Sequence, residues 1–155
     1  MSDVRKGRQI PTNEVILPYV NSHGKEAIDL YEKSGRIAQE WQQLLINDIL
    51  AYNDEGLWIH TKFGYSVPRR NGKNEVVAIR EIYGLFNGEA MLHTAHRTAT
   101  SSSAFKRLLK LITDSGLKEG DDFKVARQYG LEQIILFETN GSISFRTRTD
   151  TGGLG

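Results

Sequence analysis

The stretch that decides the fold reads Val67-Pro68-Arg69-Arg70-Asn71-Gly72-Lys73-Asn74. It matches the phosphate-binding template G-x-x-x-x-G-K-S/T at Gly72 and Lys73, whereas Val67 replaces the first glycine and Asn74 replaces the hydroxyl residue. Gly72 lets the backbone amides turn towards a phosphate, and Lys73 adds a positive charge that can reach the outer phosphates. The sequence therefore predicts a degenerate phosphate-binding loop, in which the side-chain carbonyl of Asn74 stands where the usual magnesium ligand would be.

The residues on both sides of this loop predict a strand before it and a helix after it. Residues 57–67 are rich in aromatic and β-branched side chains, which favour a strand. After the loop, apolar residues recur at helical spacing until the break at Asn87-Gly88; they are Val76, Ile79, Tyr83 and Phe86. The N-terminal amides and the dipole of this helix would strengthen the anion site.

The composition is that of one globular domain or a large part of one, with 39% hydrophobic and 25% charged residues among 155. The net charge of +1 excludes a uniformly basic protein that coats nucleic acid, but it allows local basic patches. The lack of cysteine excludes a disulfide framework, a thiolate nucleophile and a cysteine-based zinc site. Apolar runs are far shorter than the roughly 18 residues of a membrane span, and a signal core is absent, so we expect a soluble intracellular protein without a membrane partner.

The N-terminal third predicts an extended arm followed by helices. Residues 1–23 contain Pro11 and Pro18 and no lasting periodicity, which indicates an arm. Residues 25–34 predict a short helix that Gly35 ends. A longer helix with an Asn53-Asp54-Glu55-Gly56 stop is predicted from an apolar stripe made of Ile37, Trp41, Leu44, Leu45, Ile49 and Tyr52.

The C-terminal half predicts further strands around one more helix. A strand is expected over residues 89–95, and strands are expected over 124–129, 133–137 and 142–147. Between them lies a helix that Gly116 closes, with a stripe of Phe105, Leu108, Leu109 and Ile112. Asn140-Gly141 predicts a β-hairpin. This alternation predicts an α/β fold with a mostly parallel sheet flanked by helices, whose ligand lies beyond the carboxyl ends of the strands.

Several polar residues outside the loop are candidates for a structural or a functional role. His60 alternates with apolar neighbours, so we interpret it as structural. His93 and His96 lack a third metal ligand, which argues against a metal site. Arg146 and Arg148 alternate with threonines, a pattern typical of a solvated edge strand but also able to contact nucleotide or nucleic-acid phosphates.

The Trp41-Gln42 pair also remains open from spacing alone. Gln42 could hydrogen-bond an adenine edge while an aromatic or aliphatic surface packs on the ring. In the alternative, Trp41 is a core residue on the apolar stripe and Gln42 is its solvated neighbour.

Taken together, four motifs resemble a known family. They are the loop at 67–74, Trp41-Gln42, Leu92-His93-Thr94-Ala95-His96, and Phe145-Arg146-Thr147-Arg148-Thr149 followed by Gly152-Gly153. In this combination the chain resembles, over roughly residues 35–155, the N-terminal ATPase part of a tailed-phage terminase large subunit, the DNA-packaging motor. The resemblance implies an additional-strand, RecA-like P-loop NTPase fold for residues 24–155, preceded by the arm over 1–23.

The resemblance also implies an activity and a set of partners. The family uses ATP and Mg²⁺ to drive double-stranded DNA into a procapsid, and a second domain is a metal-dependent nuclease. The expected partners are double-stranded DNA, the terminase small subunit, the portal protein and further copies of the chain in a ring. The expected location is the cytoplasm of the infected bacterial host.

Residue roles follow from the resemblance at matching positions. Lys73 and the Gly72 backbone would bind the β- and γ-phosphates, and Asn74 would lie beside magnesium. Arg69 resembles a family arginine that stabilises the γ-phosphate in cis, a charge worth about three to five orders of magnitude in rate. The full set expected to bind nucleotide is Trp41, Gln42, Pro68, Arg69, Arg70, Asn71, Gly72, Lys73 and Asn74.

One departure from the family concerns its acidic motif. The family has an apolar run ending in Asp-Glu after the glycine-rich segment, and this sequence contains no such run and no nuclease carboxylates. We therefore expect an incomplete ATPase domain that binds ATP weakly without efficient turnover. The alternatives are a helicase-like or kinase-like P-loop protein, or a non-catalytic DNA- or protein-binding domain that uses Arg5, Lys6, Arg8, Arg146 and Arg148.

Overall fold

Four strands form the main sheet of the computed structural model, which describes residues 7–148. The strands are β3 (Ala90–Ala95), β4 (Phe123–Ala126), β5 (Gln133–Leu136) and β6 (Ser142–Thr147), in the order β3-β6-β5-β4. Only β3 and β6 are parallel, whereas β5 is antiparallel to both β4 and β6. The sheet is therefore mixed, and the prediction of a mostly parallel sheet was wrong. The reason is that β4, β5 and β6 follow one another through short turns, which can join only antiparallel neighbours.

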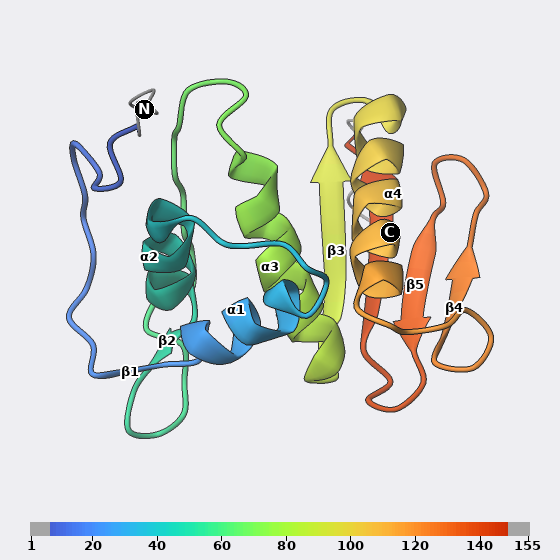
Figure 1. Ribbon diagram of the computed structural model, residues 1–155, viewed down its shortest axis with the longest axis horizontal. Coiled ribbons are helices and arrows are strands. Elements are labelled where there is room, and N and C mark those ends of the chain that lie inside the picture. Colours follow the sequence, from blue (N-terminus) through green and yellow to red (C-terminus); the bar gives the residue numbers. More distant parts are fainter. Residues whose placement is uncertain (1–6, 149–155) are drawn as a thin grey trace, which may run out of the picture.

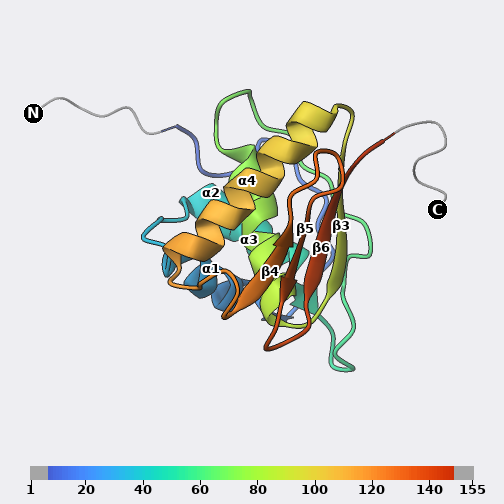
Figure 2. The same ribbon diagram turned by 90° about the vertical axis from the view of Figure 1, so that its right-hand side faces the viewer.

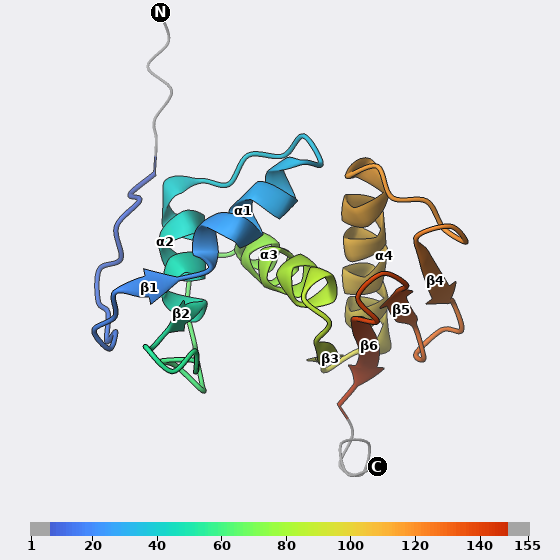
Figure 3. The same cartoon turned by 90° about the horizontal axis from the view of Figure 1, so that it is seen from below.

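The helices lie on one face of this sheet (Figure 2). α3 (Lys73–Phe86) and α4 (Thr98–Asp114) pack directly on the strands, whereas α1 (Gly24–Glu32) and α2 (Glu40–Ile49) pack on α3 (Figures 1 and 3). The core lies between these layers because every second strand residue faces the helices; among its fully buried members are Ile79, Ile82, Leu108, Ile134, Ile143 and Phe145. Within the described residues, no helix has the length and apolar character needed to cross a membrane.

α2 is shorter than predicted and buries a different row of residues. Ile37 and Leu44, expected in the apolar stripe, are 83% and 41% exposed. The buried row is Gln42, Ile46 and Leu50, spaced four residues apart along one side of the helix. The helix begins only at Glu40 because Gln39 and Gln42 form a reciprocal capping box there. The helix ends at Ile49, and β2 (Ala51–Tyr52) then pairs with β1 (Asn21–Ser22).

The strand predicted over residues 57–67 does not form. Its one strand-like pairing among the described residues is an isolated bridge between Trp58 and Tyr52. Aromatic and β-branched residues fit a half-buried pleated surface, but they give a strand only where a neighbouring strand supplies backbone partners. The segment runs instead as an extended connection into the loop.

His60 holds the N-terminal arm against the end of α2. Its Nε2 accepts a hydrogen bond from the backbone N–H of Leu17 at 3.1 Å, so the ring hydrogen lies on Nδ1, 3.0 Å from the carbonyl oxygen of Asp48. The hydroxyl of Tyr19 donates to Oδ1 of Asp48 at 2.7 Å. Burial and this hydrogen bond raise the pKa of Tyr19 to about 12. His60 therefore has a structural role.

The hairpin predicted at Asn140-Gly141 is confirmed between β5 and β6. Asn140 has a φ of 60°, which asparagine tolerates better than most residues. A Cβ on Gly141 would lie 2.2 Å from the carbonyl oxygen of Leu85 at the end of α3, so no side chain fits. The hydroxyl of Thr139 donates to that same oxygen. The turn is therefore packed closely against the end of α3 and hydrogen-bonded to it.

Candidate functional site

The loop at 67–74 leads directly into the first turn of α3. Gly72 is the N-cap residue, with φ 79° and ψ 25°, and Lys73 is the first helical residue. Glycine adopts this left-handed conformation without steric cost. Asn71 closes the preceding turn, because its side-chain amide donates to the carbonyls of Pro68 and Arg69 at 3.1 and 3.2 Å. No side chain caps α3. The N–H of Glu75 donates to the Gly72 carbonyl at 3.1 Å, whereas the amides of Lys73 and Asn74, the first two residues of the helix, have no partner inside it.

The structure brings Gln42 into contact with this loop from 30 residues away. Its Nε2 donates to the carbonyl oxygen of Gly72 at 3.1 Å, and its Oε1 accepts from the backbone N–H of Gln39 at 2.8 Å. Gln42 is 3% exposed, so the interpretation of Gln42 as a solvated neighbour was wrong. Trp41 is half-buried and donates through Nε1 to Oε1 of Gln39 at 2.9 Å. The two motifs therefore meet at one place, and part of the hydrogen-bonding capacity of Gln42 is used within the protein.

The loop lies at the end of the molecule where β3 ends and α4 begins (Figure 1). His96 and Arg97 follow β3, and Arg148 follows β6, which runs parallel to β3. These three side chains are exposed, as are Arg69 and Arg70 of the loop. This is the edge at which parallel strands present ligands.

A cavity of about 280 Å³ lies between the first halves of α3 and α4. One face of α3 lines it with Asn74, Val77, Ala78 and Glu81, β3 adds His93, and α4 adds Ala99, Thr100, Ser103, Ala104 and Arg107. Asn74 therefore belongs both to the loop and to the cavity.

Glu81 and His93 form a hydrogen-bonded pair on this cavity. Oε2 of Glu81 lies 3.1 Å from Nδ1 of His93, and Glu81 is 8% exposed. Burial raises the pKa of Glu81, and the hydrogen bond and charge of His93 partly oppose that rise. Sequence reasoning missed Glu81. The available signal was its position on the same helical face as Asn74, Val77 and Ala78.

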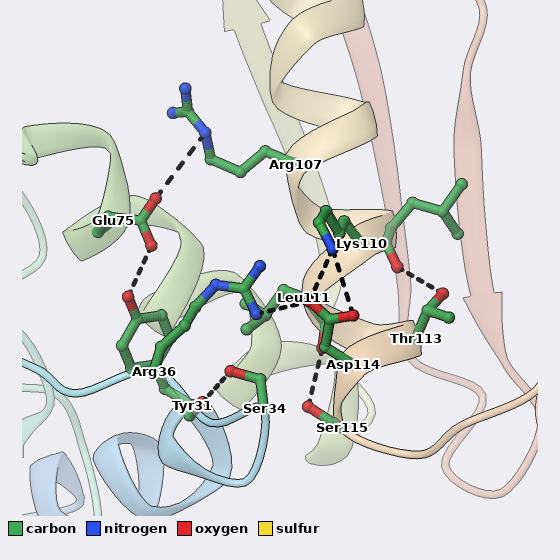
Figure 4. A network of polar contacts seen from close by, with 11 residues as sticks. Tyr31, Ser34, Arg36, Glu75, Arg107, Lys110, Leu111, Thr113, Asp114 and Ser115 are labelled. Carbon is green, nitrogen blue, oxygen red and sulfur yellow. Dashed lines mark hydrogen bonds and ion pairs between the residues drawn. The ribbon is translucent and has the colours of Figure 1, made fainter.

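A polar network connects the start of α3 to α1 and α4 (Figure 4). Glu75 accepts a hydrogen bond from the Tyr31 hydroxyl at 2.7 Å and lies 3.8 Å from Nε of Arg107. Burial and this bond raise the pKa of the Tyr31 hydroxyl. Arg36 bridges to Asp114 at 3.1 Å. The network fixes α3 between its neighbours and so positions the loop.

Other candidate residues lie apart from the loop or have local partners. Nη1 of Arg146 donates to the carbonyls of Glu132 and Phe145 at 3.0 and 2.8 Å. Arg5, Lys6, Thr149, Gly152 and Gly153 lie outside the described residues. Over residues 7–148 no group of three or more His, Cys, Asp or Glu side chains could hold a metal ion. Comparisons with protein-family models, curated proteins and solved structures found no match.

Proposed function

We propose that the loop at 67–74 binds the phosphates of ATP, and that the chain is the ATP-binding portion of a terminase large subunit that powers packaging of double-stranded DNA. The observation that carries this proposal is the joint geometry of Gly72 and Gln42. Gly72 caps α3 in a left-handed conformation, and Gln42 of the proposed adenine segment is hydrogen-bonded to it. A helix start without a side-chain cap, preceded by a glycine and beginning with a lysine, suits a phosphate group.

Each loop residue then has a defined role. The Gly72 backbone and Lys73 bind the β- and γ-phosphates, and the exposed Arg69 offers its charge to the γ-phosphate. Pro68, Arg70 and Asn71 shape the turn. Asn74 is the residue beside which magnesium would lie, but one amide oxygen is not a magnesium site by itself, so no step is assigned to the metal.

The wider proposal concerns the parent protein. It works as a ring of copies in the cytoplasm of an infected bacterium, with the portal protein, the terminase small subunit and DNA as partners, and it cuts DNA with a separate nuclease domain. A helicase-like P-loop protein would use the same loop in the same way.

The decisive experiment is thermal unfolding with magnesium and a non-hydrolysable ATP analogue. A ligand that binds only the folded state raises Tm, by linkage. We expect a rise for the natural sequence and for Lys62→Ala, a control that removes an exposed lysine outside the loop. Lys73→Ala should abolish the rise. Equal shifts in Lys73→Ala and the natural sequence would refute ATP binding at this loop.

A second candidate is phosphate-backbone binding by a non-catalytic domain. It is favoured by four exposed arginines: Arg69 and Arg70 in the loop, and Arg97 and Arg148 after the ends of the parallel strands β3 and β6. DNA affinity that falls steeply with salt, without any stabilisation by the ATP analogue, would support this candidate over the first.

A further inference from the structure

The cavity between α3 and α4 is rich in hydrogen-bond donors. The donors come from three elements and comprise the Asn74 amide, the His93 ring, the Thr100 and Ser103 hydroxyls, and the Arg107 guanidinium. The one carboxyl group on its lining, Glu81, is already hydrogen-bonded to the His93 ring. At about 280 Å³ the cavity has room for a tetrahedral oxyanion and its water.

The electrostatic field of the two helices favours an anion in the same place. Asn74 is the second residue of α3, and Thr100 is the third residue of α4, so both helices begin at the cavity. Each N-terminus carries about half a positive charge. The first turn of α4 contains no acidic residue and no side-chain cap. The acidic residue in the first turn of α3, Glu75, is held by Tyr31.

Arg107 is placed to complete an oxyanion site. Its contact with Glu75 runs through Nε and measures 3.8 Å, the longest of the ion pairs in the described residues. Figure 4 shows its two terminal nitrogens directed away from Glu75. A guanidinium uses such a pair of nitrogens to bind two oxygens of a phosphate at once.

The Glu81 and His93 pair does not exclude an anion. Protonation removes the charge of the Glu81 carboxylate, so the side chain then places no negative charge on the cavity. Burial favours proton uptake at Glu81. The other groups that act on Glu81 are Arg80, which is positively charged, and Tyr65, which is neutral below its raised pKa.

We propose that this cavity is an anion site that binds a phosphoryl group between Arg107, Thr100 and Ser103 of α4 and Asn74 of α3. The group is either inorganic phosphate or the terminal phosphate of a ligand held by the loop, since Asn74 belongs to both places. Binding of inorganic phosphate is independent of the proposed ATP function, whereas binding of a terminal phosphate rests on it.

The test is the change in Tm on addition of inorganic phosphate, with sodium chloride as the control at matched ionic strength. We expect Tm to rise with phosphate concentration and to saturate, in the natural sequence and in Lys106→Gln, which removes an exposed lysine next to Arg107 but outside the cavity. Arg107→Gln should weaken phosphate binding at least about tenfold, which corresponds to the loss of one charge-assisted contact. Thr100→Val should also weaken it while leaving the contact between Arg107 and Glu75 intact.

The outcomes separate the two proposals. A phosphate effect no larger than that of chloride, or an equal effect in Arg107→Gln and Lys106→Gln, would overturn the cavity proposal. A phosphate effect that persists in Lys73→Ala, while the ATP analogue has no effect on any variant, would support the cavity and refute ATP binding. Loss of the analogue effect in both Lys73→Ala and Arg107→Gln would identify the bound group as a terminal phosphate.

Discussion

The side-chain amide of Gln42 donates a hydrogen bond to the carbonyl oxygen of Gly72, 3.1 Å away, and so ties α2 to the start of α3. The same side chain caps its own helix through the N–H of Gln39. One buried glutamine therefore fixes both the helix start and the loop that carries Lys73.

Replacing this amide should cost stability. Gln42→Ala leaves the Gln39 N–H without its partner and removes one of the two hydrogen bonds to the Gly72 carbonyl, which keeps the N–H of Glu75. We expect a loss of about 1–3 kcal/mol in the free energy of unfolding. Urea unfolding measures it. Gln128→Ala, at an exposed position, is the control and should change stability little. A loss no larger than that of the control would show that the amide does not hold the loop.

The left-handed conformation of Gly72 predicts a second effect. Gly72→Ala should destabilise the protein by about 1–2 kcal/mol from the conformation alone. A Cβ there would also lie 3.1 Å from Nε2 of Gln42. Gly35→Ala is a matched control, because Gly35 has a φ of 88° but no atom within 4 Å of the added Cβ. The difference between the two variants in the free energy of unfolding, measured in urea, gives the cost of the contact between the added Cβ and Gln42. We expect Gly72→Ala to be the more destabilised.

Glu81 predicts a pH dependence of stability. Because burial raises its pKa in the folded protein above the ordinary value of 4.5, the folded state binds the proton more tightly than the unfolded state. Stability from this group is therefore greatest below the unfolded pKa and is lost as pH rises through the folded pKa. Glu81→Gln should gain stability relative to the natural sequence over that interval, as Tm measured against pH will show. Glu55→Gln, at an exposed position, should show the same dependence of Tm on pH as the natural sequence. A difference in Tm between Glu81→Gln and the natural sequence that does not change with pH would contradict the raised pKa of Glu81.

Glu132 predicts a stabilising substitution. Its side chain is 2% exposed, and neither carboxylate oxygen has a hydrogen-bond partner among the described residues. A buried acceptor without a partner costs about 1–3 kcal/mol. Glu132→Leu should therefore raise the free energy of unfolding, whereas Glu138→Leu at an exposed position should not. A clear loss of stability in Glu132→Leu would show that the carboxylate has a partner in solution.

Several helix boundaries were predictable from single residues. α1 is followed by Gly35 and α4 by Gly116, both with positive φ, and α3 ends at the Asn87-Gly88 break. The start of α3 at Lys73 also follows from the loop motif. These boundaries depend on the backbone angles that one or two residues can adopt, and the identity of those residues can be read from the sequence.

The burial of the polar site residues was not predictable in this way. The spacing of apolar residues along each helix does not predict that Gln42 and Glu81 are buried. Each is buried where it forms a hydrogen bond with a residue far away in the sequence. The partners, Gly72 and His93, lie 30 and 12 residues away. Such pairs depend on how helices dock, not on local spacing.

The sequence by itself determined the start of α3, the ends of α1, α3 and α4, and the Asn140-Gly141 turn, because those boundaries are set by the allowed backbone angles of the residues present. Only the tertiary structure decided that the sheet is mixed, that residues 57–67 do not form a strand, and that a cavity opens between α3 and α4. Strand pairing and cavities depend on which segments become neighbours, and that is decided by the packing of the whole chain.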